Sequence, residues 1–284
     1  MCRLFGLNAG HRLVHDRYWL LSAPDSVSAE SRRNPDGTGI GWFDAAGAPH
    51  VFKRPIAAHL DPEFKRIARD VDATTVISHV RAATAGPNTI ANCHPFLVDG
   101  RLMAHNGGFG DLVKVDARLR QFRRRAVGRT DSERFALLIA VETQRHDGDV
   151  GAGIAAAAQW LASNVPLYSL NTIVITAGNL WALRYPDQRA LRVGKRSIQA
   201  STGAPQPTWQ GRSSWAEHLF TADRPAAVVV VASEAIDATS DWRLLEPGEL
   251  LHVSADLKVT STMALDHPPH ELVLPTEPDP NVET

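Results

Sequence analysis

Short segments in the first part of the chain alternate apolar and polar residues with a period of two, which predicts strands that bury one face. The first segment begins at residue 1 and is mostly apolar. Gly47 and Pro49 lie between two later segments and indicate a turn there. The strands predicted in this part cover residues 1–8, 40–43, 51–53, 75–81 and 101–105.

Helical spacing interrupts this pattern, first at residues 61–70. Asp61 can cap a helix, Pro62 suits its first position, and Phe64 and Ile67 recur on one face. The same spacing predicts helices over residues 131–144 and over the alanine-rich residues 150–164.

After residue 169 the period returns to two. Residues 170–176 and 180–185 predict a hairpin, 226–232 a core strand, and 243–253 with 257–262 a final hairpin. Strands followed by helices and then by strands predict one layered α/β or α+β domain.

Two segments carry no such pattern. Residues 201–214 are polar and contain Pro205, Pro207 and Gly211, which predicts a mobile surface loop. Residues 266–284 hold five prolines and five acidic residues, a composition typical of disorder. The domain is therefore expected to span residues 2–265, followed by a disordered tail.

The composition argues against several classes of protein. The 284 residues include 30 Lys and Arg against 31 Asp and Glu, a balance that argues against binding to nucleic acid or to a membrane surface. Cys2 and Cys93 are the two cysteines, which excludes a disulfide framework and favours a reducing compartment. No apolar run approaches the ~18 residues of a membrane span. We expect a cytoplasmic protein.

Cys2 is the first candidate for chemistry. Removal of Met1 would place a thiol and an α-amine on one residue, so that a nucleophile and its base come together. The α-amine has an ordinary pKa of ~7.7–8.0, which suits a base near neutral pH. Cysteine is also among the residue types most often buried for packing alone, and Cys2 by itself favours that second interpretation.

Residues 105–108 read His-Asn-Gly-Gly and follow a predicted strand, which they are expected to end. The side-chain amide of Asn106 and the N–H of Gly107 could point at one oxygen, as in an oxyanion hole. Taken alone, the same residues are more commonly a plain turn.

Two charged residues, Arg81 and Asp131, occupy positions at which they could bind a charged ligand. Arg81 ends an otherwise apolar strand, where a guanidinium needs a carboxylate partner from a ligand or from the protein. Asp131 begins a predicted helix and could bind an ammonium group. Thr130 and Glu133 have the spacing of a capping box, which gives this segment a purely structural interpretation as well.

Together these segments resemble the class II glutamine amidotransferases, the N-terminal-nucleophile glutaminases, over residues 2 to 255. Each motif alone is weak, whereas several in the family's order behind an early cysteine form a specific signal. The matching residues are Cys2; Arg33 and Asp36 in Arg-x-x-Asp-x-x-Gly; His79, Arg81 and Thr84 in His-x-Arg-x-x-Thr; Asn92, His94 and Pro95; His105, Asn106 and Gly107; and Asp131.

The resemblance implies an α+β fold, the four-layer αββα sandwich of two stacked, mostly antiparallel sheets, with the nucleophile on an edge of one sheet. It implies that Cys2 attacks the γ-amide of glutamine and that Asn106 and Gly107 stabilise the oxyanion. It implies that Arg81 binds the α-carboxylate of the substrate and that Asp131 binds its α-amine. Binding roles also follow for His79, Thr84 and His94, and supporting roles for Arg33 and Asp36.

The start Cys2-Arg3-Leu4 differs from the Cys-Gly-Ile of the best-known members. It looks more like the stand-alone branch that includes the γ-glutamyl amidohydrolase of ergothioneine biosynthesis, although His94 departs from those enzymes. The expected substrate is glutamine or another γ-glutamyl small molecule. Ammonia would pass to a separate synthase subunit or to solvent.

Two other functions stay open. A non-catalytic γ-glutamyl-binding subunit would keep Arg81 and Asp131 but would not need the terminal thiol. A metal site built from Cys93, His94, His79 and His105 lacks metal-ligand spacing. We therefore expect no metal and no cofactor.

Overall fold

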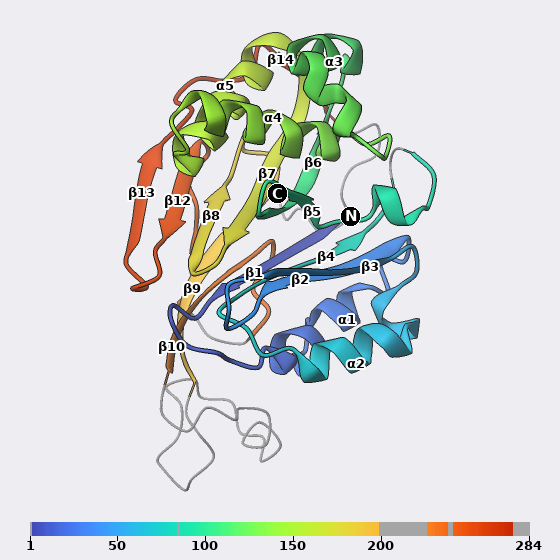
Figure 1. The fold of residues 1–284 in the computed structure, drawn as a ribbon, viewed down its shortest axis with the longest axis vertical. Coiled ribbons are helices and arrows are strands. Elements are labelled where there is room, and N and C mark those ends of the chain that lie inside the picture. Colours follow the sequence, from blue (N-terminus) through green and yellow to red (C-terminus); the bar gives the residue numbers. More distant parts are fainter. Residues whose placement is uncertain (1, 84–85, 199–225, 238–240, 275–284) are drawn as a thin grey trace, which may run out of the picture.

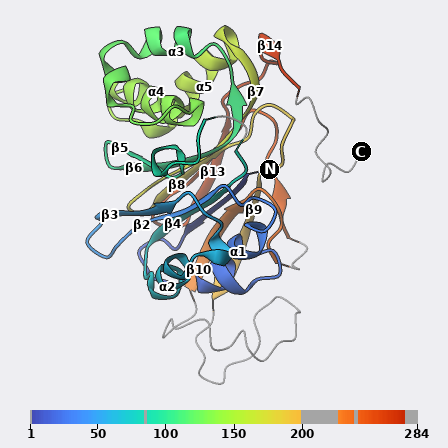
Figure 2. The same ribbon diagram turned by 90° about the vertical axis from the view of Figure 1, so that its right-hand side faces the viewer.

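The computed structural model describes residues 2–83, 86–198, 226–237 and 241–274. Two sheets pack face to face, and helices cover their outer faces, which gives the predicted order of four layers (Figures 1 and 2). The first sheet has the order β11-β9-β10-β1-β4-β2-β3, and the second the order β13-β12-β8-β7-β6-β5 with β14 beside β7. The α+β sandwich expected from the sequence is confirmed.

The first sheet consists of β1 (Arg3–Asn8), β2 (Gly37–Phe43), β3 (Pro49–Arg54), β4 (Thr75–Arg81), β9 (Arg192–Ile198), β10 (Ala226–Ala232) and β11 (Arg243–Leu244). The second consists of β5 (Phe96–Val98), β6 (Arg101–Phe109), β7 (Pro166–Thr176), β8 (Asn179–Leu183), β12 (Glu249–Val253), β13 (Val259–Met263) and β14 (Glu271–Leu272). The helices are α1 (Val27–Glu30), α2 (Pro62–Asp70), α3 (Leu112–Leu119), α4 (Asp131–Arg145) and α5 (Val150–Asn164). Shorter helical turns are η1 (Tyr18–Ser22), η2 (Ala58–Leu60), η3 (Ile90–Asn92) and η4 (Arg120–Arg125).

The alternation along the strands places the side chains in separate layers. In β1, Phe5 and Leu7 pack toward α2 and η1, whereas Leu4 packs toward the second sheet. Successive side chains of a strand point to opposite faces, so one strand serves two cores. Burial of each of these Leu or Phe side chains contributes about 1.5–3 kcal/mol to the stability of the folded state.

The second sheet is arranged in the same way. In β7, Ile173 and Ile175 face the first sheet, while Leu170 and Val174 face α4 and α5. The two helices approach closely at Gly153, where an added Cβ would lie 2.2 Å from Thr143 Oγ1. Gly153 therefore lets α5 pack close against α4, while both helices contact the second sheet, α4 at β5 and β6 and α5 at β7 and β12.

The predicted helix starts are largely confirmed. Asp61 accepts a hydrogen bond from the N–H of Glu63 at 3.0 Å, and Pro62 opens α2. Thr130 caps α4 by accepting from the N–H of Glu133 at 3.2 Å. The Glu133 carboxylate does not complete a capping box, because it accepts from the N–H groups of residues 127 and 128 in the preceding loop.

Two strand predictions were wrong. β6 does not end at His105 but continues to Phe109, and its residues pair with β7 through Gly107 and Gly108. Residues 243–253 do not form one strand, because β11 pairs with β9 in the first sheet and β12 pairs with β8 in the second. The segment between β11 and β12 thus crosses from one sheet to the other.

The chain after residue 265 differs from the disordered tail that we expected. β14 pairs in parallel with β7, and the N–H groups of His270 and Val273 donate to the carbonyls of Ala162 and Leu167. Backbone hydrogen bonds therefore hold residues up to 274 despite their proline content. Residues 275–284 of that tail, and the loop predicted at 201–214, lie outside the described residues.

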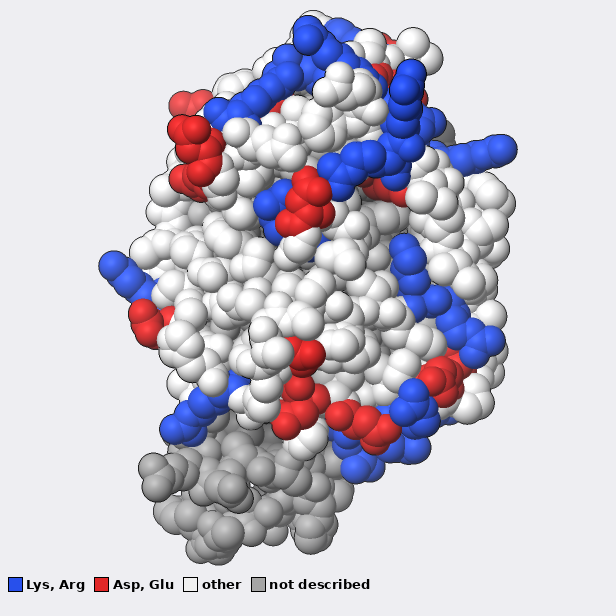
Figure 3. All heavy atoms as spheres, in the orientation of Figure 1, with Lys and Arg blue, Asp and Glu red and all other residues white. Residues whose placement is uncertain are grey.

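Charged side chains lie mainly toward the two ends of the face drawn in Figure 3, with a largely uncharged band between them. At one end, η4 buries none of its residues, and Arg123 and Arg125 pair with Asp116 and Asp99. This basic run is therefore a solvated face. None of the helices in the described residues is long and apolar enough to cross a membrane.

Candidate active site

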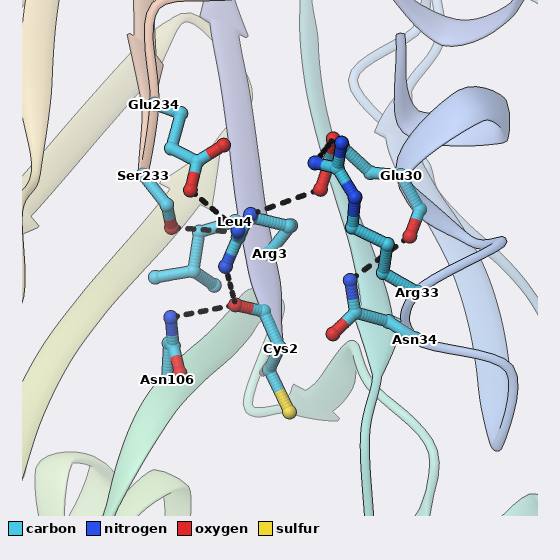
Figure 4. Close-up of polar contacts among 9 residues, drawn as sticks. All are labelled: Cys2, Arg3, Leu4, Glu30, Arg33, Asn34, Asn106, Ser233 and Glu234. Atoms are coloured by element: carbon cyan, nitrogen blue, oxygen red, sulfur yellow. Dashed lines mark hydrogen bonds and ion pairs between the residues drawn. The ribbon is translucent and has the colours of Figure 1, made fainter. Parts of the chain in front are cut away.

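Cys2 lies directly before β1, between the ends of β4 and β10. Its half-buried sulfur accepts from the N–H of Ala82 at 3.3 Å and lies 3.4 Å from the Ala82 carbonyl oxygen. Figure 4 shows Cys2 with Arg3 and Asn106. The expected place on a sheet edge is wrong, since β1 is a central strand. A central strand has neighbours on both sides, and the backbone just past β4 thereby reaches the sulfur.

Opposing influences act on the thiol. Burial raises the pKa of Cys2, while the hydrogen bond from Ala82 and the positive charge of Arg81 lower it. The negative charge of Asp131 raises the pKa as well. Both charged residues that the sequence singled out thus act on this sulfur.

Asn106 approaches Cys2 from the other sheet. Its Nδ2 donates to the Cys2 carbonyl oxygen at 2.8 Å. The next residue must be small, because a Cβ on Gly107 would lie 1.9 Å from the Ser169 carbonyl oxygen of β7. The His-Asn-Gly-Gly segment is therefore a closely paired part of β6 that brings an amide to Cys2, rather than a turn.

Arg81 is buried, with 4% of its surface exposed. It donates to Asn88 Oδ1 at 2.8 Å and to the Gly86 carbonyl at 3.4 Å. Asp36 holds the same loop, because it accepts from Asn88 Nδ2 at 3.2 Å and from the N–H of Ala83 at 2.8 Å. Asp36 therefore supports the segment around Arg81. Thr84 lies outside the described residues.

Asp131 is the first residue of α4, where the helix dipole favours a carboxylate. Its Oδ2 accepts from the N–H of Phe109 at 3.2 Å, at the end of β6. A Cβ on Gly108 would lie 3.7 Å from the same oxygen. The strand that carries Asn106 thus also orients Asp131.

Three buried imidazoles lie near the site, and the ring of His105 faces Phe135 of α4. The rings of His79 and His94 are 4.1 Å apart, and both ring nitrogens of His94 and Nε2 of His79 have no hydrogen-bond partner among the described residues. Burial, with the positive charge of Arg81, lowers the pKa of His79 to about 3 and lowers that of His94 well below its usual value. His105 is bonded to Ser132 Oγ at 2.9 Å and to the Ser169 carbonyl at 3.0 Å.

These imidazoles are neutral groups of the interior near neutral pH. His79 is 1% and His94 5% exposed, so contact of either residue with a substrate stays a prediction. Within the part of the chain that the structure describes, no three His, Cys, Asp or Glu side chains are arranged to hold a metal ion.

A charged cluster beside Cys2 contains one predicted residue, Arg33, and three residues that the sequence did not indicate, Arg3, Glu30 and Glu234. Arg33, expected to support the site, is largely exposed and pairs with Glu30 at 3.2 Å. Glu30 in turn pairs with Arg3 at 3.1 Å, and Glu234 contacts the same guanidinium (Figure 4). The charged residue directly after Cys2 was the available signal, because a charge within an apolar strand requires partners.

The family comparison bears on the same residues. The sequence profile described as "Glutamine amidotransferases class-II" matches residues 1–191, which contain all the candidate residues. The chain belongs to the class II glutamine amidotransferases. Family membership implies an enzyme of the amide-hydrolysing type.

Curated relatives of this amidotransferase carry matching descriptions. A "Putative glutamine amidotransferase" of Haemophilus influenzae is 34% identical over 138 residues, 47% of this chain and 45% of that protein. The "Probable glutamine amidotransferase DUG3" of Saccharomyces cerevisiae is 29% identical over 45% of this chain and 41% of its own length. The "Putative glutamine amidotransferase YafJ" of Escherichia coli is 29% identical over 57% and 63%. The matched regions thus cover less than two thirds of each relative.

Solved structures share the fold. A glutamine aminotransferase class-II domain protein of Silicibacter pomeroyi has a TM-score of 0.60 at 20% identity, covering 93% of this chain and 100% of that one. The glutamine phosphoribosylpyrophosphate amidotransferase of Bacillus subtilis has a TM-score of 0.62 at 18% identity, covering 95% of this chain and 51% of that one. At these identities the likeness extends to the fold alone.

Proposed function

We propose that this amidotransferase hydrolyses the γ-amide of glutamine through a thioester on Cys2. The observation that carries the proposal is the convergence on Cys2 of groups far apart in the sequence. The sulfur lies 3.3 Å from the N–H that follows Arg81, and the Asn106 amide lies 2.8 Å from the Cys2 carbonyl. Arg81 and Asp131 both act on the thiol electrostatically.

Charge complementarity supports an amino-acid head group as the ligand. Arg81 would bind the α-carboxylate and Asp131 the α-ammonium, which would present the γ-amide to the sulfur. Arg81 donates to the neutral Asn88 amide at 2.8 Å. A carboxylate would displace that amide, because charge-assisted hydrogen bonds are roughly twice as strong as neutral ones. Thr84, His79 and His94 are assigned to the same subsite, with Asp36 and Arg33 in support.

The chemistry proceeds in two half-reactions. The Cys2 sulfur attacks the γ-carbonyl carbon, and its proton passes to the α-amine that removal of Met1 exposes. Asn106 and the N–H of Gly107 stabilise the oxyanion. The C–N bond then breaks, and ammonia leaves with the proton from the α-amine. Water attacks the thioester with the α-amine as base, which releases glutamate and the free thiol.

One experiment tests the substrate and the fate of the ammonia. Mass spectrometry of the intact protein first establishes whether Met1 has been removed. Glutamine, γ-glutamyl thiols and γ-glutamyl amines are compared by glutamate release. Faster release from a larger conjugate would make this enzyme a dedicated γ-glutamyl amidohydrolase. Retained Met1 without turnover of any compound would indicate a binding subunit. With glutamine as substrate, a separate synthase subunit is the proposed acceptor of ammonia.

The head-group assignment predicts a large effect of Asp131→Asn. The variant can still accept from Phe109, but it leaves the substrate ammonium without a counter-charge, so kcat/KM should fall about 100-fold or more. Asp149→Asn is the matched control, because Asp149 caps α5 by accepting from the N–H of Ala152 at 2.9 Å. The control should keep its kcat/KM. Equal kinetics of the two variants would contradict the assignment.

A further inference from the structure

The residue after the nucleophile is a buried arginine held by two carboxylates. The Arg3 side chain is 10% exposed and pairs with Glu30 at 3.1 Å and with Glu234. Glu30 ends α1, and Glu234 follows β10, so one guanidinium joins the outer helical layer to the end of a neighbouring strand. Figure 4 shows it between the two carboxylates, with the Cys2 sulfur pointing away.

Arg3 also reaches the nucleophilic residue itself. Its Nη1 lies 3.5 Å from the Cys2 carbonyl oxygen, the atom that Asn106 Nδ2 approaches to 2.8 Å. Beyond Arg3 the chain is fixed in the sheet, because the Leu4 N–H donates to Ser233 Oγ at 3.0 Å and the Ser233 N–H donates to the Leu4 carbonyl. The peptide between Cys2 and Arg3 is therefore held on its carbonyl side by two donors.

This carbonyl controls the direction of both reactive groups. Once Met1 is removed, Cys2 is attached to the fold by a single peptide bond, and rotation about its Cα–C bond turns the α-amine relative to the carbonyl. A carbonyl fixed by two donors and an N–H donated to the sulfur together restrict that rotation. Orientation of reacting groups is worth orders of magnitude in rate.

We infer that Arg3, clamped by Glu30 and Glu234, is a positioning residue that fixes the main chain of Cys2 so that the thiol and the α-amine face the γ-amide. The inference extends the proposed function to residues outside the substrate subsite. Arg3 contacts no reacting atom and acts through the Cys2 carbonyl.

The test compares Arg3→Gln with Arg196→Gln. Arg196 has the same environment, with 8% of its side chain exposed and pairs to Asp237 at 2.8 Å and Asp241 at 3.0 Å. It lies level with Val228 in the β9–β10 ladder, whereas Ala232 of β10 is opposite Phe5 of β1. Arg196 is thus farther from Cys2 along the strands. Both variants lose a buried guanidinium, but only Arg3→Gln releases Cys2.

For Arg3→Gln we expect kcat with glutamine to fall about tenfold while KM stays within twofold, because substrate contacts are intact. Arg3→Lys keeps the charge but cannot hold two carboxylates and a carbonyl at once, so its kcat should lie between Arg3→Gln and wild type. Arg196→Gln should keep kcat. A folded Arg3→Gln protein with wild-type kcat would overturn the inference. Should that variant not fold, Glu234→Gln must lower kcat two- to threefold, and an unchanged kcat would overturn it equally.

A substrate-independent readout separates this inference from the proposed function. Without Arg3, Glu234 loses its cationic partner, whereas Glu30 keeps its pair with Arg33. The net negative charge that this adds near Cys2 disfavours the thiolate. Alkylation of Cys2 by iodoacetamide near neutral pH, followed by peptide mapping, should slow severalfold in Arg3→Gln and not in Arg196→Gln. If wild-type protein fails to hydrolyse glutamine, the proposed function fails while this rate still decides the role of Arg3. Equal rates in all three proteins would refute that role.

Discussion

Cys2 and Cys93 are chemically the same residue, yet they differ in exposure and in the hydrogen bonds to their sulfurs. The half-buried Cys2 sulfur receives an N–H from Ala82 at the end of β4. Cys93 is buried, and its thiol lies 3.5 Å and 3.4 Å from the carbonyl oxygens of Arg54 and Thr89. Burial raises the pKa of both thiols, and Cys2 too lies 3.4 Å from a carbonyl oxygen, that of Ala82. The difference is the N–H donated to the Cys2 sulfur, which lowers the pKa of that thiol.

Their neighbours extend the contrast. The charge of Arg81 lowers the pKa of both thiols, whereas Asp131 raises the pKa of Cys2 and Lys53 lowers that of Cys93. Cys93 adjoins the neutral imidazoles of the interior and packs against Gly37, where an added Cβ would lie 2.7 Å from its sulfur. The backbone just past a strand end can thus offer an N–H to a sulfur, while the same residue type in a buried loop packs against neighbouring backbone.

The largest difference between the two cysteines is expected when each sulfur is removed in turn. Cys2→Ala deletes the nucleophile, and kcat with glutamine should fall by at least about 10³-fold. Cys93→Ala should keep turnover within twofold and lower the free energy of unfolding by about 1–2 kcal/mol, because it leaves a small cavity. Steady-state kinetics and urea titrations measure both. Turnover by Cys2→Ala, or a folded but inactive Cys93→Ala, would reverse the assignment.

Alkylation sharpens the comparison without any substitution. In the native protein, iodoacetamide should modify Cys2 about 100-fold faster than Cys93, because Cys2 is more exposed and its sulfur receives the N–H of Ala82. Glutamine should slow the reaction at Cys2 alone. In concentrated urea the two rates should converge, which serves as the control. Comparable native rates would show that Cys93 is accessible and that the contrast does not hold.

The smallest expected effect concerns the neutral interior beside Cys93. The pKa of His79 is about 3 in the folded protein, against an ordinary value of ~6.5. Because the unfolded chain binds this proton and the folded chain does not, stability is lost as the pH falls from about 6.5 toward 3. The slope from one such group is at most about 1.4 kcal/mol per pH unit.

His79→Gln should flatten that slope in chemical unfolding followed from pH 7 to 5. The exposed His11, replaced in His11→Gln, is the control and should leave the slope unchanged. A slope that does not change in His79→Gln would mean that the folded and unfolded chains protonate His79 over the same pH range, contrary to a lowered pKa.

Local sequence signals located many elements. Residues 75–81 and 150–164 were predicted with the bounds that the structure has, because alternation and helical spacing are read from neighbouring residues. The prediction that residues 105–108 end the strand was wrong because Gly107 is required by a tertiary contact. The Ser169 carbonyl of β7 approaches this position too closely for a side chain. The Pro-rich residues 266–274 were misjudged because β7 and the end of α5 supply their hydrogen bonds.

The sequence by itself determined the family, the layered α+β fold and the residue types of the site, since each depends on motifs only a few residues long. Only the tertiary structure decided that Cys2 lies directly before a central strand and that Glu30 and Glu234 meet at Arg3. The physical reason is that partners for a buried charge are chosen by distance in space. Residues 30 and 234 come together through the pairing of β1 with β10 and the packing of α1 against the sheet.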